Sequence, residues 1–370
     1  MTGPTKNTAG NRKRQKSATV SDTTHVREDF MSETKSKEFI VRTSQRSDYN
    51  RCRQKEWWAY VDLLKPQRVS PPLRFGDLIH QALAVYYRPS KPGKVLRGVK
   101  PWITFDKLYV QQLEDGLTDF NIRLEDDEKW IDARALGNEM LRNYVERYGR
   151  DERYRIIAPE QAFQVDLYTE SGLYICTYVG QLDAVVQDME TKYIGLFEHK
   201  TAASIQTEHL DMDEQAGTYW AVAPFYLEQT GVLKPGEDLD FIMYNFLRKA
   251  GKDTRPQNAE GQYLNLNGSV SKKQPPPLFK REKVFRGRND RIALLQRIEQ
   301  QVAEMKLVHE GVMPHFKNIM GGCRGMFGCE YRDMCTVHES GGDWESVRDA
   351  TMTTWDPYAA HELEQEKYNG

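Results

Sequence analysis

Apolar positions recur at helical spacing on both sides of a strand-rich middle section. In each helical stretch the apolar residues return every three or four positions, which places them on one face of a helix. The helix that follows the strands can be capped by Asp211 or Asp213. On this pattern we predict helices over residues 73–87, within 102–148, over 211–229 and over 288–311.

From residue 156 the pattern changes to β-branched and aromatic segments separated by turn-forming residues. These segments predict strands over residues 156–168, 172–186 and 192–202, and a further strand over 240–249. Helices therefore precede and follow a run of strands. This order predicts an α/β fold with a helical N-terminal part, a mixed sheet and a helical C-terminal part.

The ends of the chain differ in composition from its middle. Residues 1–36 are polar and basic and almost free of aromatic residues, which predicts a disordered basic tail. Residues 37–338 form one predicted folded domain, with a proline-rich loop insertion over 250–283. The last segment, 339–370, is predicted to be an acidic tail.

The composition narrows the class of protein. The 370 residues are 39% hydrophobic and 29% charged, and no apolar run is long enough to span a membrane. An apolar secretory signal is also absent, so we predict a cytoplasmic protein whose five cysteines stay reduced. The net charge of −2 hides basic stretches, such as residues 272–291, that permit a basic groove for nucleic acid or an ordinary solvated surface.

Two predicted strands carry charges where apolar residues are expected. Asp183 interrupts one strand, and Glu198 and Lys200 interrupt the next. In a hairpin the two carboxylates would lie side by side, and a divalent cation such as Mg²⁺ or Mn²⁺ would offset their repulsion. Lys200 follows Glu198 by two positions and so points to the same side. The alternative is a surface ion pair among these three residues.

Three further polar residues extend this pattern. Gln215 and Tyr219 are separated by four positions on a predicted helix and so share one face, where they could contact a phosphate. His80 lies on an otherwise apolar helical face, either as a satisfied core residue or as a neutral metal ligand.

As a set, these segments resemble RecB-type nucleases of the PD-(D/E)XK superfamily. The resemblance covers roughly residues 45–338 and follows the family's order of motifs. It rests on FGDLIHQAL (75–83), PEQAFQV (159–165), GQLDAVV (180–186), LFEHKTA (196–202) and QAGTY (215–219). It implies the restriction-endonuclease-like core, a mixed sheet flanked by helices, and a divalent-metal-dependent nuclease.

The resemblance also implies roles for individual residues. The divalent metal would be held by His80, Asp183, Glu198 and the backbone carbonyl of His199. Lys200 would orient the attacking water, and a bound metal lowers the pKa of water and polarises the phosphoryl oxygen. The remaining roles fall to residues that contact the substrate or support the site: Gln215, Tyr219 and, more weakly, Glu160.

Three cysteines lie within thirteen residues near the end of the domain, Cys323, Cys329 and Cys335. This density indicates a metal or cluster site that needs a fourth ligand. Cys52 and Cys176 are the candidates, and the apolar strand around Cys176 favours a buried residue there.

RecB-like nucleases with an iron–sulfur cluster, including AddB-type and CRISPR-associated groups, place one cysteine before the histidine motif and three after the final helix motif. The resemblance therefore implies a structural [4Fe–4S] cluster on Cys52, Cys323, Cys329 and Cys335. The first pair of the later three is closer together in those groups, and zinc remains an alternative.

We therefore expect a DNase, an exonuclease that acts on DNA ends or single strands. The alternatives are a catalytically idle nuclease fold that serves as a DNA-binding or assembly subunit, and a structure-specific endonuclease. A helicase, a recombinase or an integrase could be its partner.

Overall fold

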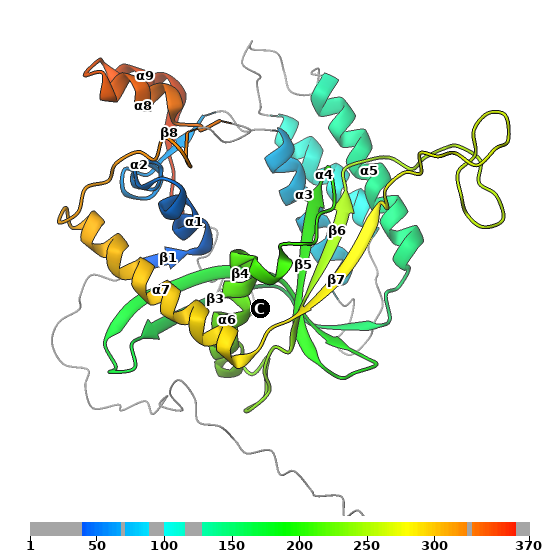
Figure 1. Ribbon diagram of the computed structural model, residues 1–370, viewed down its shortest axis with the longest axis horizontal. Coiled ribbons are helices and arrows are strands. Elements are labelled where there is room, and N and C mark those ends of the chain that lie inside the picture. Colours follow the sequence, from blue (N-terminus) through cyan, green and yellow to red (C-terminus); the bar gives the residue numbers. More distant parts are fainter. Residues whose placement is uncertain (1–38, 68–70, 89–99, 115–127, 324–327, 360–370) are drawn as a thin grey trace, which may run out of the picture.

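A computed structural model describes residues 39–67, 71–88, 100–114, 128–323 and 328–359. The predicted basic tail over 1–36 lies outside these residues. At the centre is a six-stranded mixed sheet that confirms the predicted α/β class (Figure 1). Its strands are β1 (Ile40–Arg42), β3 (Tyr154–Tyr168), β4 (Tyr174–Asp188), β5 (Ile194–Ala202), β6 (Phe241–Arg248) and β7 (Phe279–Phe285).

The central strand of this sheet is β4. It pairs with β3 in a long antiparallel hairpin, with β5 antiparallel and with β1 parallel. The strand β5 then runs parallel to β6, and β6 pairs antiparallel with β7. The crossover between β5 and β6 passes through a helix, as parallel neighbours require.

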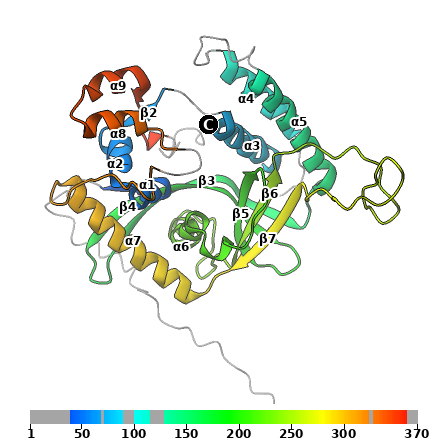
Figure 2. The same cartoon turned by 45° about the horizontal axis from the view of Figure 1, so that its top comes forward.

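Helices cover both faces of the sheet (Figures 1 and 2). On one face lie α3, α4 and α5, and on the other lie α6 and α7. Another group, α1, α2, α8 and α9, packs beside the sheet. Their bounds are α1 (Thr43–Arg51), α2 (Arg53–Glu56), α3 (Pro71–Tyr87), α4 (Pro101–Glu114), α5 (Glu128–Tyr148), α6 (Glu214–Gln229), α7 (Arg288–His309), α8 (Arg332–Glu339) and α9 (Trp344–Thr351).

Side chains alternate between the two faces of each strand, so the sheet has an apolar core on each face. On β5, Leu196 faces α6 and α7, whereas Phe197 faces α3 and α5. The next strand repeats this with Ile242 and Met243, and all four side chains are buried. Because each buried side chain of this size contributes about 1.5–3 kcal/mol, the two cores hold β5 and β6 firmly between helical layers.

The segment expected to be an acidic tail contains folded elements as far as residue 359. After α8 come α9 and the short strand β8 (Met352–Thr354), which pairs antiparallel with β2 (Leu64–Pro66). Met352 is one of the apolar residues that attach this segment to the rest of the fold, because it is buried against the segment around Trp58. Residues 360–370 lie outside the described residues.

The proline-rich insertion projects from the sheet between β6 and β7 (Figure 1). It was expected to reach residue 283, but β7 already begins at Phe279. The charged residues of β7 obscured the strand, because they alternate between faces of an edge strand rather than marking a loop. In the part of the chain that the structure describes, none of the helices has the length and hydropathy to cross a membrane.

Candidate active site

The sheet has a gap along one edge of β4. The strand β3 pairs with the opposite edge along almost the whole of β4. On the edge with the gap, β1 pairs with residues 177–179 and β5 pairs with residues 184–187. Residues 180–183 of that edge therefore pair with neither strand, and Asp183 ends this stretch.

The carboxylate of Asp183 replaces a ladder partner at the point where β4 and β5 separate. Its Oδ2 accepts a hydrogen bond from the backbone N–H of His199 at 2.7 Å. Its Oδ1 lies 3.2 Å from Nδ1 of His80 on α3. One carboxylate thus joins the two strands and the helix that covers them.

Glu198 and Lys200 lie together at the same gap, as strand alternation predicts. The Lys200 Nζ is 2.7 Å from Glu198 Oε1 and donates to Gln215 Oε1 at 3.1 Å. Glu198 is nearly buried, with 6% of its side chain exposed, whereas Lys200 keeps 27% exposed. The ammonium therefore connects the buried carboxylate to helix α6 and reaches the surface of the site.

Two glycines allow the helices to approach the gap. A Cβ on Gly76 of α3 would lie 3.1 Å from Thr201 Oγ1 on β5, so this glycine permits the close contact that brings His80 to Asp183. A Cβ on Gly180 would lie 2.8 Å from the Tyr219 ring and 2.7 Å from the Phe163 ring. The unpaired stretch of β4 thus accommodates Tyr219 because it begins with glycine.

Helix α6 presents its residues to the gap through its N-terminus. Asp213 caps the helix, and its side chain accepts hydrogen bonds from the backbone N–H groups of Gln215 and Ala216. Of the two predicted capping residues, Asp213 is therefore the cap. Tyr219 lies one turn after Gln215 on the same face and is 9% exposed.

The four charged residues perturb one another's pKa values. Burial opposes protonation of His80, but the Asp183 carboxylate outweighs it and raises the pKa of His80 to about 8. Burial likewise opposes ionisation of Asp183, yet His80 keeps the pKa of that carboxyl low. Burial raises the pKa of Glu198, although Lys200 opposes this, and the pKa of Lys200 is raised because Glu198 outweighs its burial.

Glu160 lies on β3 beside the same gap. The pairs Pro159–Ala184 and Gln161–Leu182 flank it, so it stands opposite Asp183. Its φ of +39° is in the left-handed region, which is costly for a residue without special reason to adopt it. Burial and the nearby Asp183 carboxylate raise the pKa of Glu160 to about 7. The predicted supporting residue is therefore brought to the site.

The donor atoms at the gap suit a hard divalent cation. Carboxylates from Asp183 and Glu198, an imidazole from His80 and the backbone carbonyl of His199 are the ligand types that Mg²⁺ or Mn²⁺ accept. Within the described ranges, no three His, Cys, Asp or Glu side chains are already arranged around one cation position. Instead, His80 and Lys200 pair with the two carboxylates and supply positive charge.

A cavity of about 680 Å³ opens beside the site. Gln215 and Tyr219 form part of its wall, and Gln215 accepts a hydrogen bond from Lys200, so the cavity adjoins the site. The rest of the wall is polar and comes from the start of α1, the N-terminus of α6 and one face of α7. It consists of Arg42, Thr43, Ser44, Ser47, Asn50, Asp213, Glu214, Arg297 and Gln301.

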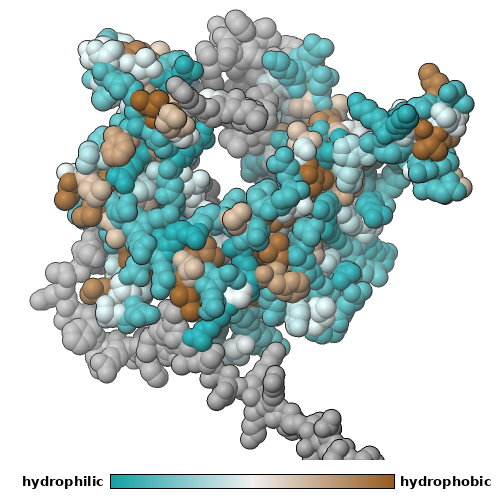
Figure 3. Space-filling model, viewed as in Figure 1, coloured by the Kyte–Doolittle hydropathy of each residue, from teal (hydrophilic) through white to brown (hydrophobic). Residues whose placement is uncertain are grey.

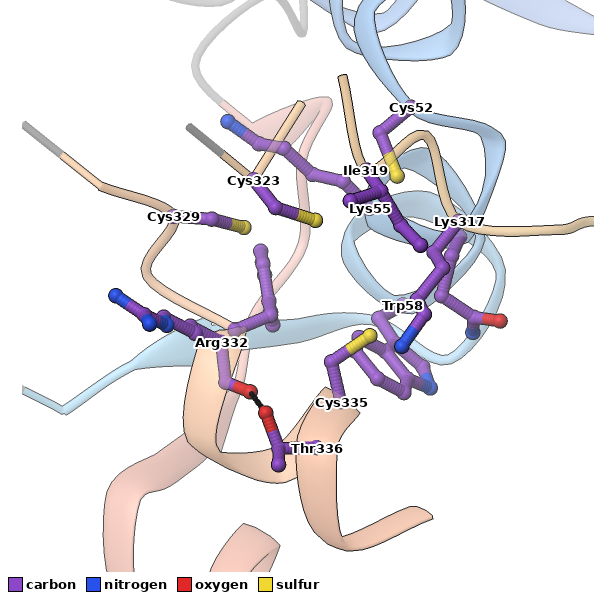
Figure 4. Close-up of a pocket in the computed structure, with 12 residues that line it drawn as sticks. Cys52, Lys55, Trp58, Lys317, Ile319, Cys323, Cys329, Arg332, Cys335 and Thr336 are labelled. Atoms are coloured by element: carbon purple, nitrogen blue, oxygen red, sulfur yellow. Dashed lines mark hydrogen bonds between the residues drawn. The ribbon is translucent and has the colours of Figure 1, made fainter. Parts of the chain in front are cut away.

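Four cysteines line a second, smaller pocket of about 150 Å³. Figure 4 shows the thiols of Cys52, Cys323, Cys329 and Cys335 directed into a common space. They come from the junction of α1 and α2, from the segment before α8 and from α8 itself. The pocket thus brings the four cysteines together, but among the described residues no three of these thiols are already arranged around one metal position.

The fifth cysteine, Cys176, lies in a different environment from these four. Cys176 is fully buried in β4 among apolar residues, as the sequence predicts, and burial raises the pKa of its thiol to about 12. It acts as a small apolar residue.

Sequence analysis missed several polar residues behind the site. Asn245 and Arg281 form part of a buried network that reaches the ring of His199. The available signals were the single amide in the apolar strand FIMYNFLR and the arginine in β7. Neither signal indicates a partner, because the network joins residues far apart in the chain.

Comparison with known proteins gives one family match. The model of the PD-(D/E)XK nuclease superfamily matches residues 43–336. The search of curated proteins found no match. Among solved structures, this chain is similar to the crystal structure of a "Putative exonuclease" from Eubacterium rectale, with 12% identity and a TM-score of 0.44. That alignment covers 80% of this chain and 90% of the other, and it is too distant to carry an argument.

Proposed function

Since the chain belongs to the PD-(D/E)XK nuclease superfamily, we propose that it is a divalent-metal-dependent deoxyribonuclease, an exonuclease that acts at DNA ends or on single strands. The observation that carries this proposal is the convergence of His80, Asp183, Glu198 and Lys200 at one gap in the sheet. These residues come from a helix and two strands, and their side-chain types are those that metal-assisted phosphodiester hydrolysis requires.

We assign the cation to His80, Asp183, Glu198 and the backbone carbonyl of His199. When bound, a divalent cation lowers the pKa of water and stabilises charge on the phosphoryl and leaving oxygens. In this structure His80 and Lys200 bring positive charge to these two carboxylates. His80 would give up its proton in order to act as a ligand.

We assign to Lys200 the role of orienting the attacking water. Its ammonium is anchored by Glu198 and Gln215, which leaves one of its three N–H donors for water or a phosphate oxygen. A positive charge fixed at this position stabilises negative charge that develops on the phosphorane-like transition state. Gln215 positions the ammonium, and Tyr219 supports the DNA strand. Glu160, with its raised pKa, can supply or accept a proton near neutral pH.

The cavity beside the site supports a strand or strand end as the substrate. Ser44, Ser47 and Asn50 are exposed at helical spacing on α1 and line the cavity, so they present donors along one direction. Figure 3 shows the surface hollowed between the side of the molecule that carries α1 and α7 and the side that carries α3. Arg42 and Arg297 at the cavity can contact phosphates.

We further propose that the four cysteines hold a structural [4Fe–4S] cluster. The convergence of Cys52, Cys323, Cys329 and Cys335 on one pocket supports this proposal. Such a cluster ties the start of the nuclease domain to its end. Zinc is the alternative occupant, and the visible absorption and iron content of the purified protein separate the two.

The test uses end-labelled DNA with Mn²⁺. The proposal predicts cleavage of linear single-stranded DNA, products that shorten progressively from an end, and no cleavage in EDTA. Cleavage of circular single strands would instead identify an endonuclease. Binding of DNA without cleavage, at any Mg²⁺ or Mn²⁺ concentration, would overturn the proposal and favour an inactive DNA-binding subunit.

A further inference from the structure

A buried polar network lies behind the active-site strand, on the face of the sheet that α3 and α5 cover. Arg281 on β7 forms a two-pronged ion pair with Asp151, with Nη1–Oδ1 at 2.9 Å and Nη2–Oδ2 at 2.6 Å. Only 13% of the Arg281 side chain and 5% of the Asp151 side chain are exposed. A buried pair of this geometry is well defined because guanidinium and carboxylate match at two contacts.

Two tyrosines complete the bonding of this ion pair. One N–H of Arg281 Nη2 goes to Asp151, and the hydroxyls of Tyr144 and Tyr87 share the other at 2.9 and 3.1 Å. The Tyr87 hydroxyl donates to Asp151 Oδ2 at 2.8 Å, and the two tyrosine hydroxyls bond to each other. Burial raises the pKa of both phenols, so both keep their protons and can donate. The network is therefore satisfied throughout, as a buried polar cluster must be.

Asn245 on β6 links this network to His199 on β5. Arg281 Nε donates to Asn245 Oδ1 at 3.0 Å. Because a guanidinium can only donate, the amide oxygen must face Arg281 and the amide nitrogen must face the other way. That nitrogen donates to the Tyr144 hydroxyl at 3.0 Å and to His199 Nδ1 at 2.8 Å.

The orientation of Asn245 fixes the state of His199. Since Nδ1 of His199 accepts a hydrogen bond, the imidazole carries its proton on Nε2. His199 as a whole is 2% exposed, and its ring stacks on the ring of Tyr87 with ring centres 5.6 Å apart. A neutral ring also agrees with burial, which lowers the pKa of His199 to about 3.

His199 is the residue between Glu198 and Lys200. Its ring points to the opposite face of β5, while its backbone N–H holds Asp183 Oδ2 at 2.7 Å. We propose that Asn245, clamped by Arg281 and Asp151, is a positioning residue that holds the His199 backbone in the geometry needed to bind the cation. This inference rests on the proposed function, because it assigns the His199 carbonyl and the Asp183 carboxylate to that cation.

The proposal has a physical precedent in metal sites generally. Groups that hydrogen-bond to the ligands, without touching the metal, fix ligand orientation, and their loss typically costs about 10- to 100-fold in metal affinity or activity. Here Asn245 bonds to the imidazole ring of His199, and the backbone carbonyl of His199 is the group assigned to the cation. Removal of Asn245 frees the ring to shift and leaves one buried donor of Arg281 unpaired.

The test measures Mn²⁺ binding by calorimetry on the full chain with Asn245→Ala. Asp183→Asn serves as the reference. Mn²⁺ binding that is present in wild type and absent in this variant is attributed to the gap. We expect Asn245→Ala to weaken this binding about 10- to 100-fold and to lower kcat by a similar factor, with little change in the KM for DNA. Tyr109→Phe is the matched control, because it removes one buried hydrogen bond, to the Trp130 carbonyl, from the same core.

All variants are compared at a temperature where near-ultraviolet circular dichroism shows them folded. If Asn245→Ala does not fold, His199→Phe keeps an aromatic ring for the stack and removes both ring nitrogens, the Nδ1 acceptor of the Asn245 bond among them, and the same loss of Mn²⁺ affinity is expected. Affinity and kcat equal to those of Tyr109→Phe would overturn the inference. Equal binding by wild type and Asp183→Asn would instead overturn the proposed function itself.

Discussion

The gap in the sheet and the cysteine pocket are built in different ways. At the gap, charged groups are already paired: Asp183 with His80, and Glu198 with Lys200. The backbone that carries them lies between two large cores. The cysteine pocket lies beside a small apolar cluster around Trp58 and joins the start of the domain to its end.

The thiols of that pocket have few other interactions to hold them. Burial raises the pKa of Cys329 and of Cys335, so these thiols are neutral without a ligand. The difference teaches that the fold positions the gap residues before any cation binds. At the cysteine pocket, the chain segments are joined by a small apolar cluster and by bonds such as that from the Tyr331 hydroxyl to the Leu64 carbonyl, and the proposed cluster would add a further cross-link. Loss of cation from the gap should therefore cost activity, and loss of the proposed cluster should cost stability.

The largest expected effect is on activity at the gap. Lys200→Ala removes the ammonium assigned to the attacking water, and we expect kcat to fall about 10³-fold. The unfolding midpoint in urea should also fall, because the nearly buried Glu198 carboxylate loses its partner, so the rates are compared under conditions where both proteins are folded. Single-turnover cleavage of labelled DNA measures the rate, with Lys234→Ala as the control at an 83% exposed lysine. A Lys200→Ala protein that cleaves within tenfold of wild type contradicts the assigned role.

The next effect is on stability at the cysteine pocket. Cys329→Ser should remove the iron and the brown colour and lower the free energy of unfolding by about 2–4 kcal/mol, as for loss of a cross-link that closes a long loop. Iron analysis and urea denaturation measure both quantities. Cys176→Ala is the control, because this buried thiol is outside the pocket and its loss should leave the iron content unchanged. Full iron content and stability in Cys329→Ser would refute the cluster assignment.

Gly180→Ala tests how closely the core supports the gap. The added methyl group would meet the Phe163 and Tyr219 rings at less than 3 Å, so one ring must move. Overpacking of this kind costs about 1–3 kcal/mol of stability. We also expect weaker DNA binding because Tyr219 is displaced. Gly287→Ala is the control, since its Cβ would meet its nearest neighbour at 3.7 Å. If Gly180→Ala matches the control in thermal unfolding and DNA binding, the close approach has no consequence.

The smallest expected effect concerns a carboxylate on the same strand as Asp183 but outside the gap. Asp188 is paired with Lys283 at 2.6 Å. Burial opposes its ionisation, but Lys283 and the backbone N–H of Glu190 outweigh burial and lower the pKa of Asp188 to about 2. Its pKa is lower in the folded than in the unfolded chain. The pair therefore stabilises the fold above pH 3.8, and this contribution is lost as pH falls from 3.8 towards 2.

We expect Asp188→Asn to lower the free energy of unfolding at neutral pH by about 1–2 kcal/mol, with allowance for solvent screening. The difference from wild type should close as pH falls through that window. Urea titrations at a series of pH values measure it. Stability curves that stay parallel down to pH 2 would show that the pair contributes nothing.

The sequence predicts the fold and the candidate site residues for clear physical reasons. Apolar periodicity marks the long helices, and the charges at Asp183, Glu198 and Lys200 stand out because strands rarely carry unpaired charge. Their spacing predicts a hairpin, which the structure contains. The helix motif with Gln215 follows from a simple four-residue period.

Other features could not be predicted because they depend on contacts between distant segments. The gap at residues 180–183 arises because β1 and β5 share one edge of β4, which no local pattern shows. The link from Asp151 through Arg281 to Asn245 joins three elements across the core. The segment after residue 339 looked like a tail because its charge outweighs the few apolar residues, such as Met352, that attach it.

The central claim is that the gap between β4 and β5 is a cation-binding nuclease site. Crystals of Lys200→Ala with Mn²⁺ and a short single-stranded oligonucleotide would test it most directly. The account predicts an anomalous manganese peak among His80, Asp183 and Glu198, with a phosphate of the oligonucleotide beside it. Manganese bound elsewhere with His80 still paired to Asp183, or an oligonucleotide bound away from the gap, would contradict the account.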